Sequence, residues 1–178
     1  MKGLILNLLE DVVRAEHGED YWDGVVDESG LAASYTSMGT YPDHEVETLA
    51  SLVARRDGVT APEVIRHVGR SGMPALAARY PGFFDPHPGL RPFLLSLNTT
   101  IHPEVRRLYP GAVIPEFDVA FPDTHVLELG YVSERGRCDL AEGLVLGAAE
   151  HYGEQVVVSQ RTCVHRGDDR CVIRVELR

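Results

Sequence analysis

The chain has 178 residues, 44% hydrophobic and 25% charged, an ordinary composition for a globular protein of one domain. The formal net charge of −10 argues against nucleic acid or an anionic membrane as a partner, because both are polyanions. The short apolar run at the N-terminus ends at Glu10 and Asp11, where a secretory signal would still be apolar. No stretch approaches the roughly 20 apolar residues of a membrane span, so we expect a cytoplasmic protein.

The first part of the chain has the apolar spacing of amphipathic helices, with hydrophobic residues recurring at intervals of three and four. Thr60 precedes a proline and is followed three residues on by Glu63, which is the pattern of a capped helix N-terminus. The expected helices are residues 4–14, 43–56, 61–68 and 73–80.

The second part of the chain changes from helical to alternating patterns. Residues 81–92 hold four of the eleven prolines and are expected to form a loop that joins two lobes. A longer helix is expected over 93–108, followed by strands at 114–121 and 125–133, a helix at 136–152, and strands at 154–162 and 171–177. These elements predict an α+β fold in a single domain, residues 1–178. A helical lobe ends near residue 80, and an α+β lobe with a small antiparallel sheet begins near residue 90.

The segment Tyr131-Val132-Ser133-Glu134-Arg135 is the most specific local pattern. On a strand, Tyr131, Ser133 and Arg135 would share one face and offer two hydroxyls and a guanidinium. That set suits two carboxylates held close together, because arginine binds a carboxylate through charge-assisted hydrogen bonds. Taken alone, such a pattern is more often a half-exposed strand whose polar face meets water.

His102 is the second element, one residue from the apolar stripe of the expected helix 93–108. A lone histidine at such a position is most often a partly buried residue that bonds a backbone carbonyl. Haem ligation would require the imidazole to point into an apolar cavity, and the neighbouring residues permit this.

The sequence resembles the H-NOX (haem nitric oxide/oxygen binding) family along nearly its whole length. The resemblance is carried by a set of motifs in a fixed order: Met1-Lys2-Gly3-Leu4-Ile5 with Leu8-Leu9-Glu10, Ile101-His102-Pro103-Glu104-Val105, Leu108-Tyr109-Pro110 with Pro115, Tyr131-Ser133-Arg135, and Ala141-Glu142-Gly143-Leu144.

The resemblance implies the H-NOX fold, with haem b bound between the two lobes. It implies that His102 is the proximal iron ligand and that Tyr131, Ser133 and Arg135 hold the haem propionates. It also implies a pocket lined by Ile5, Leu9, Pro74, Ile101, Pro115, Leu140 and Leu144.

Leu140 bears on the choice of gas. Members of the family that bind O2 stably place a tyrosine hydroxyl over the iron, at the position that Leu140 holds here. Bound O2 is polar and gains from a hydrogen-bond donor, whereas NO and CO bind without one. Because a missing hydrogen bond costs about 1 kcal/mol or more, we expect binding of NO and CO and exclusion of O2.

Pro103 directly follows the expected iron ligand. Proline removes one backbone donor from a helix and biases the preceding residue, here His102, away from helical geometry. It is either a tolerated kink or the source of a strained bond between iron and His102.

Cys138, Cys163 and Cys171 are expected to converge, because two of them flank the predicted turn at residues 166–169 and the third opens a helix. Some members of the family carry zinc on three cysteines and one histidine, but Gln160 stands at the histidine position here and is a poor zinc ligand. His165 is a possible substitute. Free thiols, or a redox-active disulfide between two of the three, are the alternatives.

No nucleophile elbow, phosphate-binding loop or pair of carboxylates suggests an enzyme. The leading hypothesis is a gas-binding sensor that signals to a separate protein, for which the family implies a histidine kinase or a diguanylate cyclase. The alternative is a vinyl-reductase-type domain that binds an apolar organic molecule, which the tail from Thr162 to Ile173 resembles. That alternative gives His102 no role.

Overall fold

The computed structural model describes residues 1–178. In chain order its elements are α1 (Gly3–His17), α2 (Glu19–Ser29), α3 (Asp43–Asp57), α4 (Ala61–Ser71), α5 (Met73–Arg79), α6 (Pro81–Phe84), α7 (Leu90–Ser96), the π-helical turn η1 (Leu97–Ile101), α8 (His102–Leu108), β1 (Glu116–Asp123), β2 (Val126–Val132), α9 (Cys138–His151), β3 (Val156–Thr162), the 3-10 turn η2 (Val164–Arg166) and β4 (Cys171–Leu177). No helix combines the length and the apolar character that are needed to cross a bilayer.

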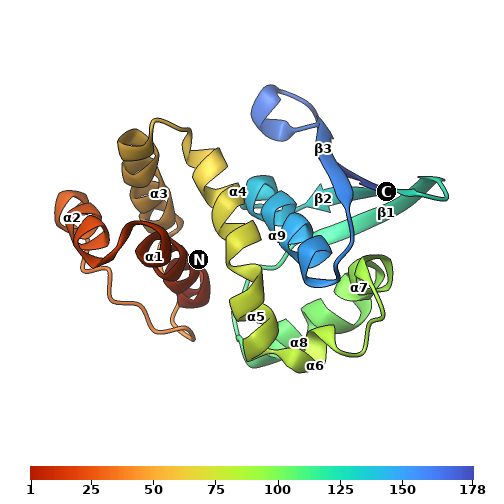
Figure 1. The fold of residues 1–178 in the computed structure, drawn as a ribbon, viewed down its shortest axis with the longest axis horizontal. Coiled ribbons are helices and arrows are strands. Elements are labelled where there is room, and N and C mark those ends of the chain that lie inside the picture. Colours follow the sequence, from red (N-terminus) through yellow and green to blue (C-terminus); the bar gives the residue numbers. More distant parts are fainter.

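Helices α1 to α3 form one side of the molecule, and the sheet with α5 to α8 forms the other (Figure 1). Between them, α4 and α9 lie against each other and join the two sides. All neighbouring strands of the sheet are antiparallel, in the order β1-β2-β4-β3. The architecture is the expected one: a helical lobe followed by an α+β lobe.

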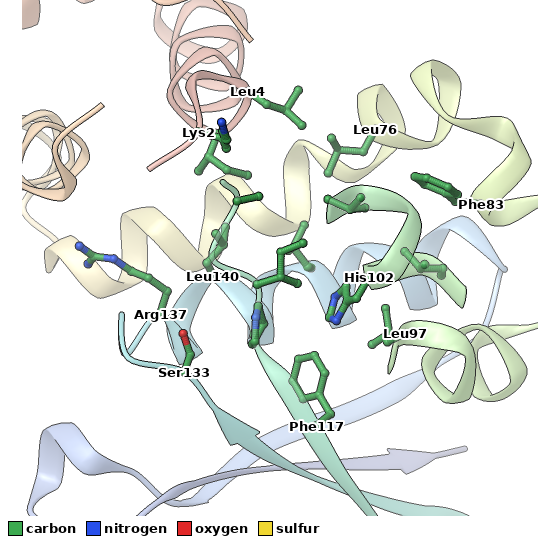
Figure 2. Close-up of a pocket in the computed structure, with 18 of the residues that line it drawn as sticks. Lys2, Leu4, Leu76, Phe83, Leu97, His102, Phe117, Ser133, Arg137 and Leu140 are labelled. Carbon is green, nitrogen blue, oxygen red and sulfur yellow. The ribbon is translucent and has the colours of Figure 1, made fainter. Parts of the chain in front are cut away.

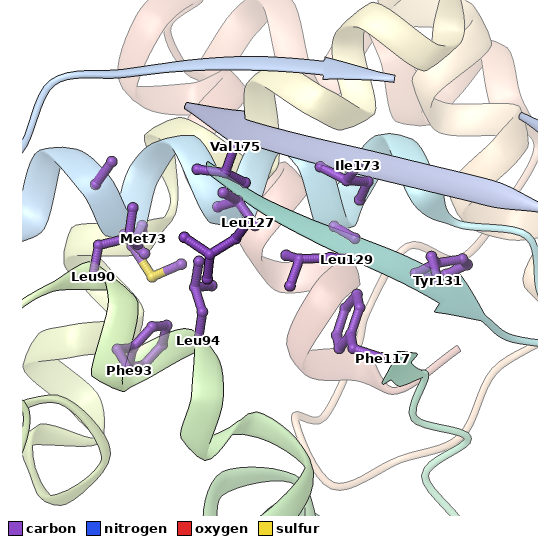
Figure 3. Close-up of a cluster of buried hydrophobic side chains, with 14 of the residues drawn as sticks. Met73, Leu90, Phe93, Leu94, Phe117, Leu127, Leu129, Tyr131, Ile173 and Val175 are labelled. Atoms are coloured by element: carbon purple, nitrogen blue, oxygen red, sulfur yellow. The ribbon is translucent and has the colours of Figure 1, made fainter. Parts of the chain in front are cut away.

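Each side has its own hydrophobic core. The core of the helical side is formed by residues from α1 to α4, and Leu140 of α9 reaches into it. The core of the other side lies between the sheet, α7 and α9, where Leu127 and Leu129 of β2 face Leu94 of α7 (Figure 3). The division between the cores falls between Val68 and Met73, before the proline-rich segment.

The N-terminus of α4 shows how local sequence sets these helices. The backbone N–H of Glu63 donates to Thr60 Oγ1 at 3.4 Å, and the Thr60 N–H donates to the Glu63 carboxylate at 2.8 Å. This reciprocal capping satisfies two backbone donors that the helix leaves open. The predicted start of this helix is confirmed.

Helix α2 is an element that the sequence pattern did not predict. Its sequence is acidic, and only two of its 11 residues are buried, which favours an interpretation as a solvated segment. Trp22 and Val25 are nevertheless completely buried against the helical core. Two anchors are enough because Gly18, with φ of 91°, turns the chain sharply at the end of α1 and returns α2 to the core.

The region 81–108 also differs from the expectation of a loop and one continuous helix. The proline-rich segment contains the short helix α6 and the start of α7. Beyond it, the predicted helix is divided by the π-helical turn η1, in which the His102 N–H donates to the Leu97 carbonyl. Pro103 has no N–H to continue an α-helical ladder through this region, and the wider turn accommodates it.

A ligand cavity and a thiol cluster

A cavity of about 290 Å³ with mostly apolar walls lies between the two sides of the molecule (Figure 2). It is lined by 29 residues, of which 23 are hydrophobic. Its volume is close to the lower end of the roughly 300–1,000 Å³ found for small-molecule sites. The cavity therefore suits a mostly apolar ligand with a few polar groups.

His102 is the first residue of α8, and its side chain lies in this cavity with Phe117 beside it, the ring centroids 5.9 Å apart (Figure 2). Burial lowers the pKa of His102 to about 4; the charge of Arg106 adds to this effect, and the backbone of Pro115 opposes it. The imidazole Nδ1 is buried and has no hydrogen-bond partner. His102 is therefore neutral at physiological pH, which is the form that binds a metal.

Two contacts fix the position of the helix that carries His102. The Asn98 amide of η1 donates to the Phe117 carbonyl at 2.7 Å, and the Phe117 N–H donates to Asn98 Oδ1 at 3.2 Å. These bonds fasten η1 to β1 directly beside His102. Nothing in the local sequence shows that Asn98 meets this strand.

Tyr131, Ser133 and Arg135 all line one end of the cavity. They do not share a strand face as expected, because β2 ends at Val132 and the following residues form a turn. Tyr131 Oη accepts the Arg137 N–H at 3.0 Å, and Ser133 Oγ accepts the Arg135 N–H at 3.3 Å. The turn, rather than strand alternation, brings the three side chains together.

Residues of the helical side complete this polar end. Arg135 Nε lies 3.1 Å from Asp43 Oδ2, and the amino group of Met1 lies 2.5 Å from Asp43 Oδ1. Burial alone would raise the pKa of Asp43. The hydrogen bond and charge of the amino terminus, with Arg135 and Arg137, hold it below its ordinary value instead. Asp43 is thus an ionised link between the two sides.

Most of the expected pocket residues line the cavity. They are Ile5, Ile101, Pro115, Leu140 and Leu144. Two do not, and the prediction for them is wrong. Leu9 lies one turn along α1 from Ile5 and is fully buried in the helical core. Pro74 is exposed. Met73, Leu76 and Tyr80, which are spaced three and four residues apart, face the cavity, and position 74 therefore lies on another face of the helix.

The other hydroxyl and ammonium groups of the cavity wall bond to the protein. The hydroxyls of Tyr80 and Tyr109 are hydrogen-bonded to each other. Lys2 Nζ donates to Thr40 Oγ1 at 2.7 Å and to the Pro110 carbonyl at 2.7 Å. Neither tyrosine was predicted as a pocket residue, since their meeting depends on how α5 and α8 pack.

Cys138, Cys163 and Cys171 converge, with all three sulfur atoms within 4.8 Å of one another and all three residues buried. Burial raises the pKa of Cys138 to about 12 and also raises that of Cys171. The side chain of Gln160 hydrogen-bonds to Cys138. His165 does not join the cluster as a substitute ligand. It is exposed, and its Nε2 is bonded to the Gly136 carbonyl at 2.6 Å.

Comparison with known families gives a match to the sequence model described as Haem-NO-binding, over residues 2–160. The chain belongs to this family, the H-NOX family. The resemblance stated from the motifs is thereby confirmed. No curated protein matches the chain.

Solved H-NOX structures have the same fold. One from S. oneidensis, in the Fe(II)NO state, matches with a TM-score of 0.93 at 30% identity, over 100% of this chain and 99% of that one. An NMR structure of an H-NOX domain from Shewanella oneidensis in the Fe(II)CO state gives 0.89 at 30% identity, over 100% and 99%. The unliganded Fe(II) H-NOX protein from K. algicida, at 24% identity, gives 0.88 over 100% and 97%. The expected H-NOX fold is confirmed.

The residues of this H-NOX chain fit haem. An apolar cavity holds a neutral histidine with an unpaired buried nitrogen, as an axial ligand requires. At one end stand two hydroxyls and two guanidinium groups, which suit the two carboxylates that haem carries on one edge.

Proposed function

We propose that this chain, as a single H-NOX unit over residues 1–178, is a haem-based sensor that binds NO and CO at ferrous iron and excludes O2. The observation that carries the proposal is the neutral imidazole of His102 inside an apolar cavity that has a polar, carboxylate-binding end. No arrangement of nucleophile and base lines this cavity, and we propose a binding rather than a catalytic role.

Bound haem b would supply an iron atom that can bind a diatomic gas. His102 would hold the iron on the protein side. Tyr131, Ser133 and Arg135 would bind the propionates. Because Tyr131 Oη accepts the Arg137 N–H, its own proton is left to donate to a carboxylate.

The choice of gas follows from the hydrocarbon part of the wall. Ile5, Leu140 and Leu144 offer no side-chain donor to a bound gas. A polar bound O2 would lack a hydrogen bond worth about 1 kcal/mol or more, while NO and CO lose nothing by its absence.

We propose that the chain passes the signal of gas binding to a separate protein. The resemblance to the family implies that this partner is a histidine kinase or a diguanylate cyclase. The two are distinguished by adding the ferrous and the NO-bound forms to each type of enzyme and measuring autophosphorylation or cyclic dinucleotide synthesis. A partner of the chain should respond differently to the two forms.

The test of the sensor proposal is an absorption spectrum of the purified protein, reduced without air and then exposed separately to CO, NO and air. We expect a Soret band that shifts with CO and NO and no stable complex with O2. His102→Ala should lose haem unless imidazole is supplied. A protein that takes up no haem on supplementation would refute the proposal and favour the organic-ligand alternative.

We further propose that the thiol cluster is a zinc site with three cysteine ligands. Cys163 Sγ lies 3.6 Å from Cys138 Sγ and 3.8 Å from Cys171 Sγ. Thiolates around tetrahedral zinc, at about 2.3 Å from the metal, lie about 3.8 Å apart. The side chain at the fourth position is the amide of Gln160, so binding should be weaker than with a histidine there.

Metal analysis together with thiol titration distinguishes the three states of the cluster. About one zinc per chain with no reactive thiol supports the site. Three titratable thiols without metal indicate free cysteines, and one thiol with a mass lower by two hydrogens indicates a disulfide.

A further inference from the structure

A second guanidinium stands at the polar end of the cavity, outside the Tyr-x-Ser-x-Arg pattern. Arg137 lies two residues beyond Arg135 and also lines the cavity. Its side chain is only 17% exposed, and its Nε is buried without a hydrogen-bond partner. Since buried donors are nearly always satisfied, this N–H indicates an acceptor that binds there.

The rest of the Arg137 guanidinium is already held by the other side of the molecule. Its Nη2 pairs with Glu47 of α3, one turn along that helix from Asp43, which pairs with Arg135. The guanidinium has five N–H donors, so Glu47 can accept from Nη2 while the single Nε–H serves another acceptor. Asp139 is the other carboxyl near Arg137, and its Oδ1 accepts the N–H of Leu140 at 2.9 Å.

The position of Arg137 fits a carboxylate at the mouth of the cavity. Figure 2 shows Arg137 at the same end as Ser133, with its guanidinium extending away from His102. A ligand whose apolar body lies near His102 would bring its peripheral carboxylates to this end. Arg137 also shapes the motif itself, because its backbone N–H donates to Tyr131 Oη at 3.0 Å.

We propose that Arg137 is a second guanidinium ligand of the haem carboxylates. Its Nε–H binds one propionate while Glu47 holds Nη2 of the same guanidinium, and Arg135 binds the other propionate. This inference rests on the proposed binding of haem. It makes the propionate end a bridge, in which each arginine contacts both a haem carboxylate and a carboxylate of α3.

The competing explanation is that Arg137 acts only through its ion pair with Glu47, and that water satisfies Nε. The two explanations differ in what happens when the haem carboxylates are removed. We therefore compare haem b with haem dimethyl ester, in which both propionates are esterified, in the intact protein and in Arg137→Gln, Glu47→Gln and Arg70→Gln. Arg70 is a matched control, because it pairs with Glu150 on the facing helix and does not line the cavity.

The measurement is the rate of haem transfer to excess apomyoglobin. A lost charge-assisted hydrogen bond should speed the loss of haem b from Arg137→Gln by roughly 10- to 100-fold. Glu47→Gln and Arg70→Gln should stay within about threefold of the unsubstituted protein, as partly exposed ion pairs do. With the dimethyl ester, the difference between Arg137→Gln and the unsubstituted protein should disappear.

Equal acceleration in Arg137→Gln and Glu47→Gln would overturn the inference, and so would an effect of Arg137→Gln that persists with the ester. Circular dichroism of each variant establishes that it folds, and Arg137→Lys, which keeps the charge without the fork, should recover only part of the retention. Failure of the unsubstituted protein to bind haem b would instead refute the proposed function, so the two failures are distinguishable.

Discussion

At the scale of the residue, burial decides the state of the ionisable groups in and around the cavity. It keeps His102 neutral, and it raises the pKa of Glu142 on α9, although the charge of Arg66 opposes this. Glu142 is 8% exposed, and its Oε1 lies 2.9 Å from Arg66 Nη2 of α4. A buried carboxylate held by one half-exposed arginine is a marginal arrangement, because desolvation opposes its charge.

Glu142→Gln should therefore change how stability depends on pH. The folded pKa of Glu142 is above its ordinary value of 4.5, so the native state binds the proton more tightly than the unfolded state. The stabilisation linked to this proton is complete below the unfolded pKa and is lost as pH rises through the folded pKa. The stability of the unsubstituted protein should thus fall relative to Glu142→Gln over that window, measured by urea unfolding from pH 4 to pH 8.

Glu150→Gln is the control, because Glu150 is an exposed carboxylate that pairs with Arg70 on the same pair of helices. Its unfolding is measured over the same pH range, for comparison with Glu142→Gln. Parallel stability curves for Glu142→Gln and the unsubstituted protein would contradict the assignment.

At the scale of the element, the crossing of α4 and α9 depends on glycines. A side chain at Gly143 would overlap the Arg66 carbonyl, and one at Gly147 would lie 2.6 Å from the Arg70 carbonyl oxygen. On α4, a Cβ at Gly69 would lie 2.8 Å from the Leu140 carbonyl oxygen. The two helices that join the lobes are therefore in backbone contact, which holds Leu140 at the cavity.

Gly143→Ala should destabilise the protein by about 1–3 kcal/mol or more, because the new methyl group must push two helix backbones apart. Gly82→Ala in α6 should change the free energy of unfolding by less than about 1 kcal/mol, since nothing lies within 4 Å of its Cβ position. Urea unfolding of both variants measures the difference. Equal effects would show that the crossing is not tight in solution.

The π-helical turn η1 and Pro103 together set the direction of His102. Pro103→Ala restores an N–H that could extend α-helical bonding back toward η1, and so reorient the imidazole. If strain at this proline weakens the bond of His102 to iron, the NO complex of Pro103→Ala should retain that bond in a larger fraction of molecules. The absorption spectrum of the NO complex reports this fraction, and a spectrum and formation rate identical to those of the unsubstituted protein would exclude strain at Pro103.

At the scale of the whole molecule, one ligand cavity is closed by two separate cores. Met1, Lys2, Leu4 and Ile5 reach it from the helical side, while His102 and Tyr131 reach it from the other. Four ion pairs also cross between the sides, namely Arg135 with Asp43, Arg137 with Glu47, Arg66 with Glu142, and Arg70 with Glu150. A ligand in the cavity therefore contacts both cores at once.

Haem binding should consequently stabilise both sides together. We expect amide hydrogen exchange in α1 to slow along with that in α7 and α8 when haem is added, because binding favours only the state in which both sides close the cavity. Exchange in α2, none of whose residues lines the cavity, serves as the reference for global unfolding. Protection confined to α7 and α8 would mean that the helical side does not hold the ligand.

The sequence by itself determined the family, the change from a helical to an α+β part of the chain, and the residue types at the site. Local sequence is enough to recognise helical periodicity, the Thr60 cap and the motifs around His102 and Tyr131, because each depends on residues close together in the chain. The same periodicity, applied to α5, would have placed Met73 and Leu76 at the cavity instead of Pro74.

Tertiary structure alone decided which distant groups meet. The pairings of Arg137 with Glu47 and of Arg135 with Asp43 join residues far apart in the chain, and the turn after β2 places Ser133 and Arg135 at the cavity. His165, the possible zinc ligand, instead bonds the Gly136 carbonyl. Such contacts depend on how helices and strands pack. The sequence around a residue does not show which distant residue it will contact. The buried Nε of Arg137 became visible only when the fold showed that nothing else reaches it.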